Sequence, residues 1–254
     1  MTRIETVLPS GPMPAIGTLN EGHLHASLKE WYSKPGDRRE VPFDGFVIDL
    51  VRGDLLVEIQ TRGFASLKAK LARLVRSRPV RLVHPIAEEK WIIKPVGESG
   101  TVGEDRIARR RSPKKGRIED VFWELVGLPH LLGHPNFSLE VLLTKEEERR
   151  RFDGRQGWRR KGWVVEERRL IEVVGRRLFT TRADWRGLIP TDLGDSFTAK
   201  DLAEALGIVV PLARRMAYCF RQARIVQLMA KRGRAHVYGT TEPAEMGCYQ
   251  PSAI

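Results

Sequence analysis

The fold of this chain is decided within residues 44–61, DGFVIDLVRGDLLVEIQT, where two apolar runs flank a short polar turn. Runs rich in Val, Ile and Leu on either side of a Gly-Asp dipeptide predict an antiparallel β-hairpin. With Gly53 and Asp54 as the turn, strand pairing places Asp49 directly opposite Glu58. If the turn is moved by one residue, both acids still lie on one face of the sheet, because a loop of even length keeps the same alternation of side chains between the two strands.

These two acids have apolar neighbours. In this register their face also holds Val47, Val51, Leu56 and Gln60, and the opposite face, expected to pack on a helix, holds Ile48, Leu50, Leu55, Val57 and Ile59. Like charges opposed across a hairpin cost a few tenths to about 1 kcal/mol. A divalent cation would offset that repulsion, since Mg²⁺ binds carboxylate oxygens and keeps waters, one of which can attack a phosphodiester. The alternative is a wet acidic face, which antiparallel sheets often have.

The elements around the hairpin follow from the spacing of apolar residues. A period of three to four residues predicts helices over 20–32 and 66–77. Runs of apolar and β-branched residues predict further strands over 80–86 and 90–95. The expected order is therefore helix, two or three antiparallel strands, helix, strand.

This order and its acids resemble the PD-(D/E)XK nuclease superfamily over about residues 18–96, with Glu21 on the first helix, Asp49 on a strand and Glu58-Ile59-Gln60 on the paired strand. The resemblance implies an α/β core of mixed sheet with flanking helices, and an endonuclease that cleaves nucleic acid, DNA first of all, with Mg²⁺ or Mn²⁺. It implies Asp49 and Glu58 as metal ligands and Glu21 as a helical acid that joins them. It also allows a homodimer.

Gln60 departs from the family pattern, because it stands where a lysine helps to activate water. Lys68 or Lys70 on the next helix could replace that lysine, although both also fit as solvated helix residues. Two functions therefore stay open. One is a metal-dependent nuclease in which Asp49, Glu58, Gln60 and Glu21 form the catalytic site. The other is a DNA-binding or regulatory protein whose nuclease-like domain has lost catalysis.

The charge distribution independently indicates a nucleic-acid partner. The net charge is +12 and the isoelectric point is about 10.1. Most of the excess lies in residues 106–186, in Arg-rich runs interleaved with Trp158 and Trp163, and arginine binds phosphate oxygens bidentately. The alternative is a solvated basic surface with core tryptophans. The expected contacts here are Arg109, Arg110, Arg111, Lys114, Lys115, Arg159, Arg160 and Lys161.

Residues 196–239 resemble a winged helix-turn-helix. Thr198 and Asp201 match a capping box before a short helix that ends at Gly207, and a second helix is expected over about 210–224. Two strands around an Arg-Gly-Arg turn would form the wing. The expected nucleic-acid contacts are Arg214, Arg215, Arg221, Arg232 and Arg234. Winged helices also serve as protein-contact domains, so the pattern leaves that alternative open.

The expected domains are a lead (1–17), a nuclease-like domain (18–105), a basic region with a helix near 118–132 and a β-hairpin (106–186), a winged helix (187–241) and a tail (242–254). Cys219 and Cys248 are too few for a disulfide scaffold, and His23 and His25 point to different helix faces, so neither pair predicts a metal site. The first 17 residues do not have the apolar core expected of a signal peptide, and no run of apolar residues reaches membrane-spanning length. We therefore predict a cytoplasmic protein without a membrane partner.

Overall fold

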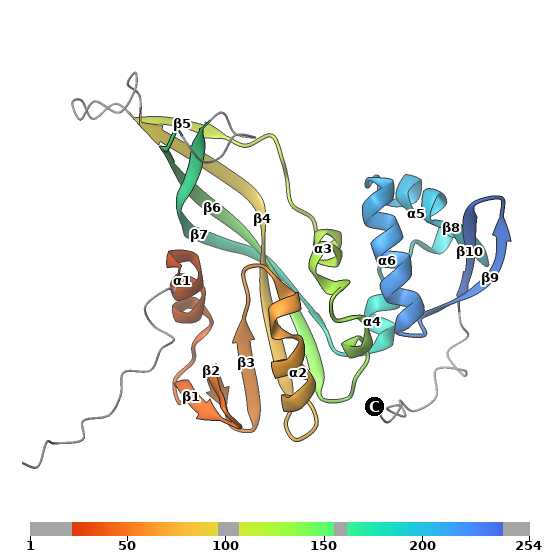
Figure 1. Cartoon of the computed structure of the whole chain (residues 1–254), viewed down its shortest axis with the longest axis horizontal. Coiled ribbons are helices and arrows are strands. Elements are labelled where there is room, and N and C mark those ends of the chain that lie inside the picture. Colours follow the sequence, from red (N-terminus) through yellow and green to blue (C-terminus); the bar gives the residue numbers. More distant parts are fainter. Residues whose placement is uncertain (1–21, 96–106, 155–161, 241–254) are drawn as a thin grey trace, which may run out of the picture.

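The structure, a computed structural model, describes residues 22–95, 107–154 and 162–240, and its centre is a seven-stranded mixed sheet (Figure 1). The strand order is β1-β2-β3-β4-β6-β7, and β5 pairs with β4. These strands are β1 (Arg38–Phe43), β2 (Phe46–Arg52), β3 (Leu55–Ile59), β4 (Val80–Pro95), β5 (Ile107–Arg111), β6 (Phe137–Phe152) and β7 (Trp163–Phe179). The mixed α/β class expected from the sequence is confirmed.

The helices are α1 (His23–Tyr32), α2 (Lys68–Leu74), α3 (Phe122–Leu125), α4 (Arg182–Arg186), α5 (Ala199–Leu206) and α6 (Val210–Gln222). Short 3-10 helices are η1 (Phe64–Leu67), η2 (Ile118–Val121), η3 (Pro129–Leu131) and η5 (Thr191–Leu193). A second, antiparallel sheet of three strands has the order β8-β10-β9, with β8 (Ser196–Thr198), β9 (Val226–Arg232) and β10 (Ala235–Thr240). No helix in the described ranges is both long and apolar enough to cross a bilayer.

The hairpin of β2 and β3 has the predicted register. Its pairs are Leu50 with Val57, Val51 with Leu56 and Arg52 with Leu55. Gly53 in the turn has a φ of 56°, a left-handed conformation that glycine adopts without steric cost. The turn chemistry thus sets the register in which Asp49 and Glu58 come to the end of the paired segment.

A crossover through η1 and α2 brings β4 parallel to β3. The predicted strands 80–86 and 90–95 are one strand of 16 residues, with an irregularity between Ala87 and Glu89. Pairing with β6 along nearly this whole length compensates for the weak strand preference of the Ala-Glu-Glu-Lys segment between the two predicted runs.

The middle region joins the same sheet. β5 and β6 both pair with β4, and β7 pairs with β6, so strands from both sides of the expected boundary between residues 105 and 106 belong to one continuous sheet. The prediction of a single helix near 118–132 was wrong, because the segment divides into η2, α3 and η3. Pro129 begins η3 and has no amide hydrogen to continue a preceding helix.

Helices cover both faces of the hairpin. Leu24, Leu28 and Tyr32 of α1 pack against Leu50, Val57 and Ile59. Leu71 and Leu74 of α2 belong to the larger core on the other face, with Val51 and Leu56. Ile48, expected beside Leu50, packs in this larger core instead. Val47 is exposed.

The C-terminal part has the secondary structure predicted for a winged helix. The Thr198 hydroxyl accepts hydrogen bonds from the amides of Lys200 and Asp201, while the Asp201 carboxylate accepts the Thr198 amide, which completes the capping box. The helix ends at Gly207, whose φ is 61°. Cys219 of α6 is buried, and burial raises the pKa of its thiol to about 12, which disfavours the reactive thiolate. Cys248 lies outside the described residues.

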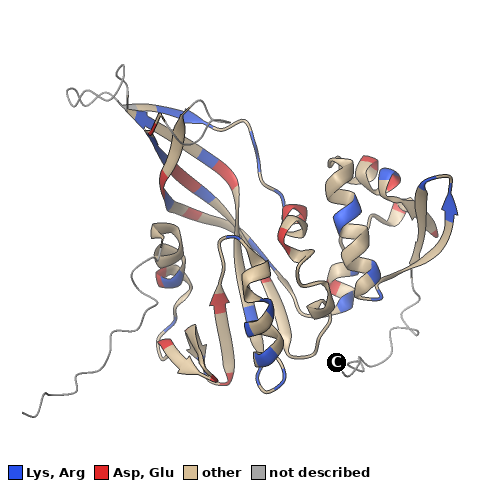
Figure 2. Ribbon diagram, in the orientation of Figure 1, with Lys and Arg blue, Asp and Glu red and all other residues tan. Residues whose placement is uncertain are grey.

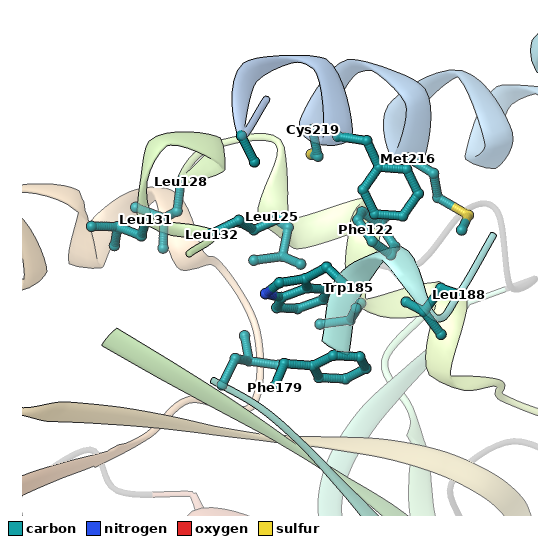
Figure 3. Packing of buried hydrophobic residues seen from close by; sticks show 14 of the residues in the cluster. Phe122, Leu125, Leu128, Leu131, Leu132, Phe179, Trp185, Leu188, Met216 and Cys219 are labelled. Atoms are coloured by element: carbon teal, nitrogen blue, oxygen red, sulfur yellow. The ribbon is translucent and has the colours of Figure 1, made fainter. Parts of the chain in front are cut away.

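This part shares the larger core with the sheet (Figure 3). Phe122 of α3 contacts Phe220 of α6 edge to face, with ring centroids 5.2 Å apart, and Trp185 of α4 at 5.8 Å. Trp185 in turn stacks on Phe179 of β7 at 4.0 Å. A continuous set of aromatic rings therefore fixes α6 to the sheet.

Candidate active site and nucleic-acid contacts

The candidate site lies where β2 and β3 separate. Their paired register ends at Leu50 and Val57, and β3 continues beside β4. Here Oδ2 of Asp49 accepts a hydrogen bond from the Ile59 amide at 2.8 Å and lies 3.3 Å from Nε2 of His25 on α1. The Asp49 carboxylate is thus held from the side of α1.

Glu58 is held from the other side of the sheet, by α2. Nζ of Lys70 lies 2.6 Å from Oε1 of Glu58 and donates a hydrogen bond to the Val47 carbonyl, also at 2.6 Å. The contact with Oε1 is an ion pair that lacks the direction of a hydrogen bond, and this buried oxygen accepts no hydrogen bond from the described residues. Each carboxylate is therefore contacted by a basic side chain from a different helix, while the two remain near enough for the charge of Asp49 to raise the pKa of Glu58.

The two acids differ in their ionisation. Burial, helped by the negative charge of Asp49, raises the pKa of Glu58 to about 7, although Lys70 opposes the shift. Burial also raises the pKa of Asp49, but the hydrogen bond and charge of His25 and the Ile59 amide bring it below its usual value. Asp49 is consequently ionised at neutral pH, where Glu58 titrates.

Of the remaining predicted catalytic residues, Gln60 does not join this pair. The Gln60 side-chain amide donates to the Arg62 carbonyl at 2.6 Å, so it serves a local turn. Of the two lysines offered as replacements, Lys70 contacts Glu58, whereas Lys68 is exposed. Glu21 lies outside the described residues.

His25 and Lys29 are the neighbours that the sequence did not reveal. Lys29 donates to Glu40 at 2.8 Å, and its charge helps to lower the pKa of Asp49. The sequence does show that the two residues are four apart and therefore lie on one face of the helix. That Asp49 is their neighbour follows only from the packing of α1. His23 lies 3.5 Å from Glu167, whereas His25 contacts Asp49, so the two histidines have different partners.

A divalent cation fits this donor set. Among the residues that the structure describes, no group of three or more His, Cys, Asp and Glu could hold a metal ion. Mg²⁺ needs only one or two carboxylates, because waters and substrate phosphates complete its shell. Asp49 and Glu58 supply two, and Oε1 of Glu58 is a buried oxygen that accepts no hydrogen bond among the described residues. Hard oxygen donors of this kind suit Mg²⁺ or Mn²⁺.

In the described part of the basic middle region, some cations are exposed and others are paired. Arg109 lies over the Trp91 ring at 4.2 Å and 3.8 Å from Glu147, and Arg111 pairs with Glu89 at 2.6 Å. Exposed positions are occupied by Arg110, Lys114 and Lys115. Arg159, Arg160 and Lys161, together with Trp158, lie outside the described residues.

The winged part presents a narrow polar stripe on α6. Arg214, Tyr218 and Arg221 are exposed and spaced four and three residues apart, which places them on one helix face. Arg215 lies instead over the Trp123 ring, 4.9 Å from its centroid. The exposed Arg232 and Arg234 flank Gly233 at the wing, where Figure 2 shows blue at the tip of the β9–β10 hairpin.

Comparisons with known proteins place most of the chain in one family. Residues 22–180 match the family described as "Domain of unknown function (DUF8091)". An uncharacterized protein of Treponema pallidum (strain Nichols) is 29% identical over 232 residues, which is 91% of this chain and 89% of the relative. Because this alignment is longer than the family match, the similarity continues into the C-terminal part. No solved structure matches the chain.

Proposed function

We propose that this chain, which belongs to the DUF8091 family, is a Mg²⁺- or Mn²⁺-dependent endonuclease that acts on DNA. One observation carries the proposal: Nζ of Lys70 lies 2.6 Å from Oε1 of Glu58. Lys70 of α2 thus supplies beside Glu58 the positive charge that Gln60 cannot provide. The order helix, antiparallel β1-β2-β3, crossover helix, parallel β4 also supports the proposal, since it is the order that the resemblance implies.

Each residue has a distinct task in this proposal. Asp49 and Glu58 would hold the metal ion, which when bound would supply a water activated for attack on a phosphodiester. The Ile59 amide and His25 fix the orientation of Asp49. Lys70 is close enough to orient the water or to stabilise negative charge that develops on the phosphate. Glu58 must be ionised to bind the metal, so activity should rise with pH through about 7.

Replacing Lys70 with methionine should reduce metal-dependent nicking of supercoiled DNA about 100-fold, since proton transfer or charge stabilisation by one group contributes on that order. Lys68→Met is the matched control, because Lys68 is an exposed lysine of the same helix. DNA affinity should stay the same in both variants. Equal cleavage rates for Lys70→Met and the intact protein would remove Lys70 from the mechanism.

The exposed stripe of α6 and the wing would hold duplex DNA, with arginines on phosphates or base edges. Substituting Arg214 and Arg221 together with glutamine should weaken duplex binding and flatten the plot of log affinity against log salt by about 1.8, because each lost phosphate contact removes about 0.9. Arg39→Gln, at an exposed arginine paired with Glu30, should change neither quantity. An unchanged slope in the double variant would show that α6 does not contact phosphate.

A DNA-binding regulator without catalysis is the second candidate, and the burial of Glu58 with Lys70 favours it, because this ion pair already satisfies much of the site. The two functions can be distinguished by measuring binding and cleavage of supercoiled, linear and branched DNA, each with Mg²⁺ and with Mn²⁺. DNA binding without cleavage of any substrate would identify the regulator. Cleavage that survives Glu58→Ala would mean that the activity comes from another site.

A further inference from the structure

The far ends of four strands form a surface away from the helices, at the upper left in Figure 1. We call this surface the arm face and define it by Lys94 of β4, Arg110 of β5, Arg150 and Phe152 of β6, and Trp163 of β7. None of these residues belongs to the candidate active site or to α6. In Figure 2 the neighbouring strand β5 is largely blue.

Strand register places these side chains on one face of the sheet. Arg110 and Glu148 both pair with Ile92, and Phe152 pairs with Trp163. Residues two apart on a strand share a face, so Lys94 lies with Ile92, and Arg150 and Phe152 lie with Glu148. The contacts agree, because Nζ of Lys94 lies 4.1 Å from the Trp163 ring centroid.

Positive charge gathers on this face. Arg150 pairs with Glu148 at 2.5 Å, whereas Lys94 and Arg110 have no carboxylate partner among the described residues. Burial first, and then the charges of Arg150 and Arg110, lower the pKa of Lys94, so these cations are near enough to repel one another. A bound anion would relieve that repulsion, and a nucleic-acid phosphate supplies one at each nucleotide.

An aromatic ring stands among these cations. Phe152 is 51% exposed and meets Trp163 edge to face, with centroids 5.7 Å apart. An apolar ring left exposed within a basic surface offers a stacking partner for a base, which is the combination that single-strand binding proteins use. In an intact duplex each base is stacked on its neighbours, so only an unpaired base has a face free for such contact.

We propose that the arm face binds single-stranded nucleic acid, with phosphates at Lys94 and Arg110 and an unpaired base stacked on Phe152. The proposal rests on the nuclease function above and specifies its substrate. It selects DNA with an unpaired segment, such as a flap, gap or fork, over intact duplex. The duplex part of such a substrate would remain with α6 and the wing.

Binding can be tested apart from cleavage, with the full chain in EDTA and the fluorescence anisotropy of a labelled oligothymidylate and of a blunt duplex of equal length. Phe152→Ala and Phe152→Leu should each weaken binding of the oligothymidylate about tenfold, since both remove the stacking ring, and leave duplex binding unchanged. Leu178→Ala is the control, because Leu178 is an exposed apolar residue of β7 outside the arm face. Lys94→Gln with Arg110→Gln should flatten the single-strand salt slope by about 1.4.

The outcomes distinguish this proposal from the nuclease function. Oligothymidylate binding that depends on Phe152 supports the arm face even if no substrate is cleaved. Phe152 variants that bind the oligothymidylate as well as the intact protein does, or that lose single-strand and duplex binding equally, overturn it without touching the nuclease proposal. Phosphatidylserine vesicles serve as a further probe, and binding of vesicles through Phe152 without binding of the oligothymidylate would assign the face to a membrane surface instead.

Discussion

Replacing Trp185 with alanine should lower the free energy of unfolding by about 3 to 5 kcal/mol, the usual cost of removing a large aromatic side chain from a core. Trp185 is 1% exposed and stacks on Phe179 with an interplanar angle of 11°. Figure 3 shows it between Phe179 below and Phe122 and Leu125 above. The cavity left by the substitution would lie between the sheet and the helices α3 and α6. Both parts of the chain should therefore lose stability.

Urea unfolding followed by far-UV circular dichroism measures this loss, and Trp31→Ala is the matched control because Trp31 is 45% exposed. The control should cost about 1 kcal/mol or less. The intact protein should unfold in one transition, since the aromatic rings join its two sheets in a single core. Two separate transitions, with only the second one shifted by Trp185→Ala, would contradict this view of the core.

Replacing Glu58 with glutamine should instead raise the free energy of unfolding, and so stabilise the protein, at pH 8. The pKa of Glu58 is raised from 4.5 to about 7, so ionising this residue is more costly in the folded chain than in the unfolded chain. Glutamine resembles the neutral form, and a shift of this size corresponds to on the order of 3 kcal/mol. The Lys70 ion pair is already included in the raised value and therefore does not reverse the sign.

The pH dependence provides the check. Below pH 4.5 Glu58 is protonated in both states, so the variant and the intact protein should be equally stable. The stability of the intact protein relative to the variant should then fall as pH rises and level off above pH 7. Glu30→Gln, at an exposed carboxylate, is the control. A Glu58→Gln protein that is less stable than the intact protein at pH 8 would mean that Lys70 compensates fully for the burial.

Several elements followed from the sequence because their causes are local. The Gly53-Asp54 turn sets the register of β2 and β3, since the pairing on either side of a short turn is determined by that turn. The capping box of α5 needs only Thr198 and Asp201, three residues apart. The two helices and the wing hairpin of the C-terminal part were predicted from periodicity and turn residues in the same way.

The middle region depended on tertiary structure. The β4–β6 ladder runs from the pair Val80–Phe137 to the pair Ile93–Arg149, between segments far apart in the chain. No local pattern encodes such parallel pairing, because its hydrogen bonds join residues that are distant in the sequence. For the same reason the sequence suggested two short strands where β4 is one long strand.

The partners of the two acids were also decided by tertiary packing. The sequence placed Asp49 and Glu58 near each other and offered Lys68 and Lys70 equally. The choice of Lys70 depends on the rotation of α2, which Leu71 and Leu74 set by packing into the core. Likewise, His25 reaches Asp49 because α1 is fixed over the sheet by Leu24 and Leu28. Residue types and local register are properties of the sequence, whereas the side of the sheet from which a charge approaches depends on how each helix buries its apolar face.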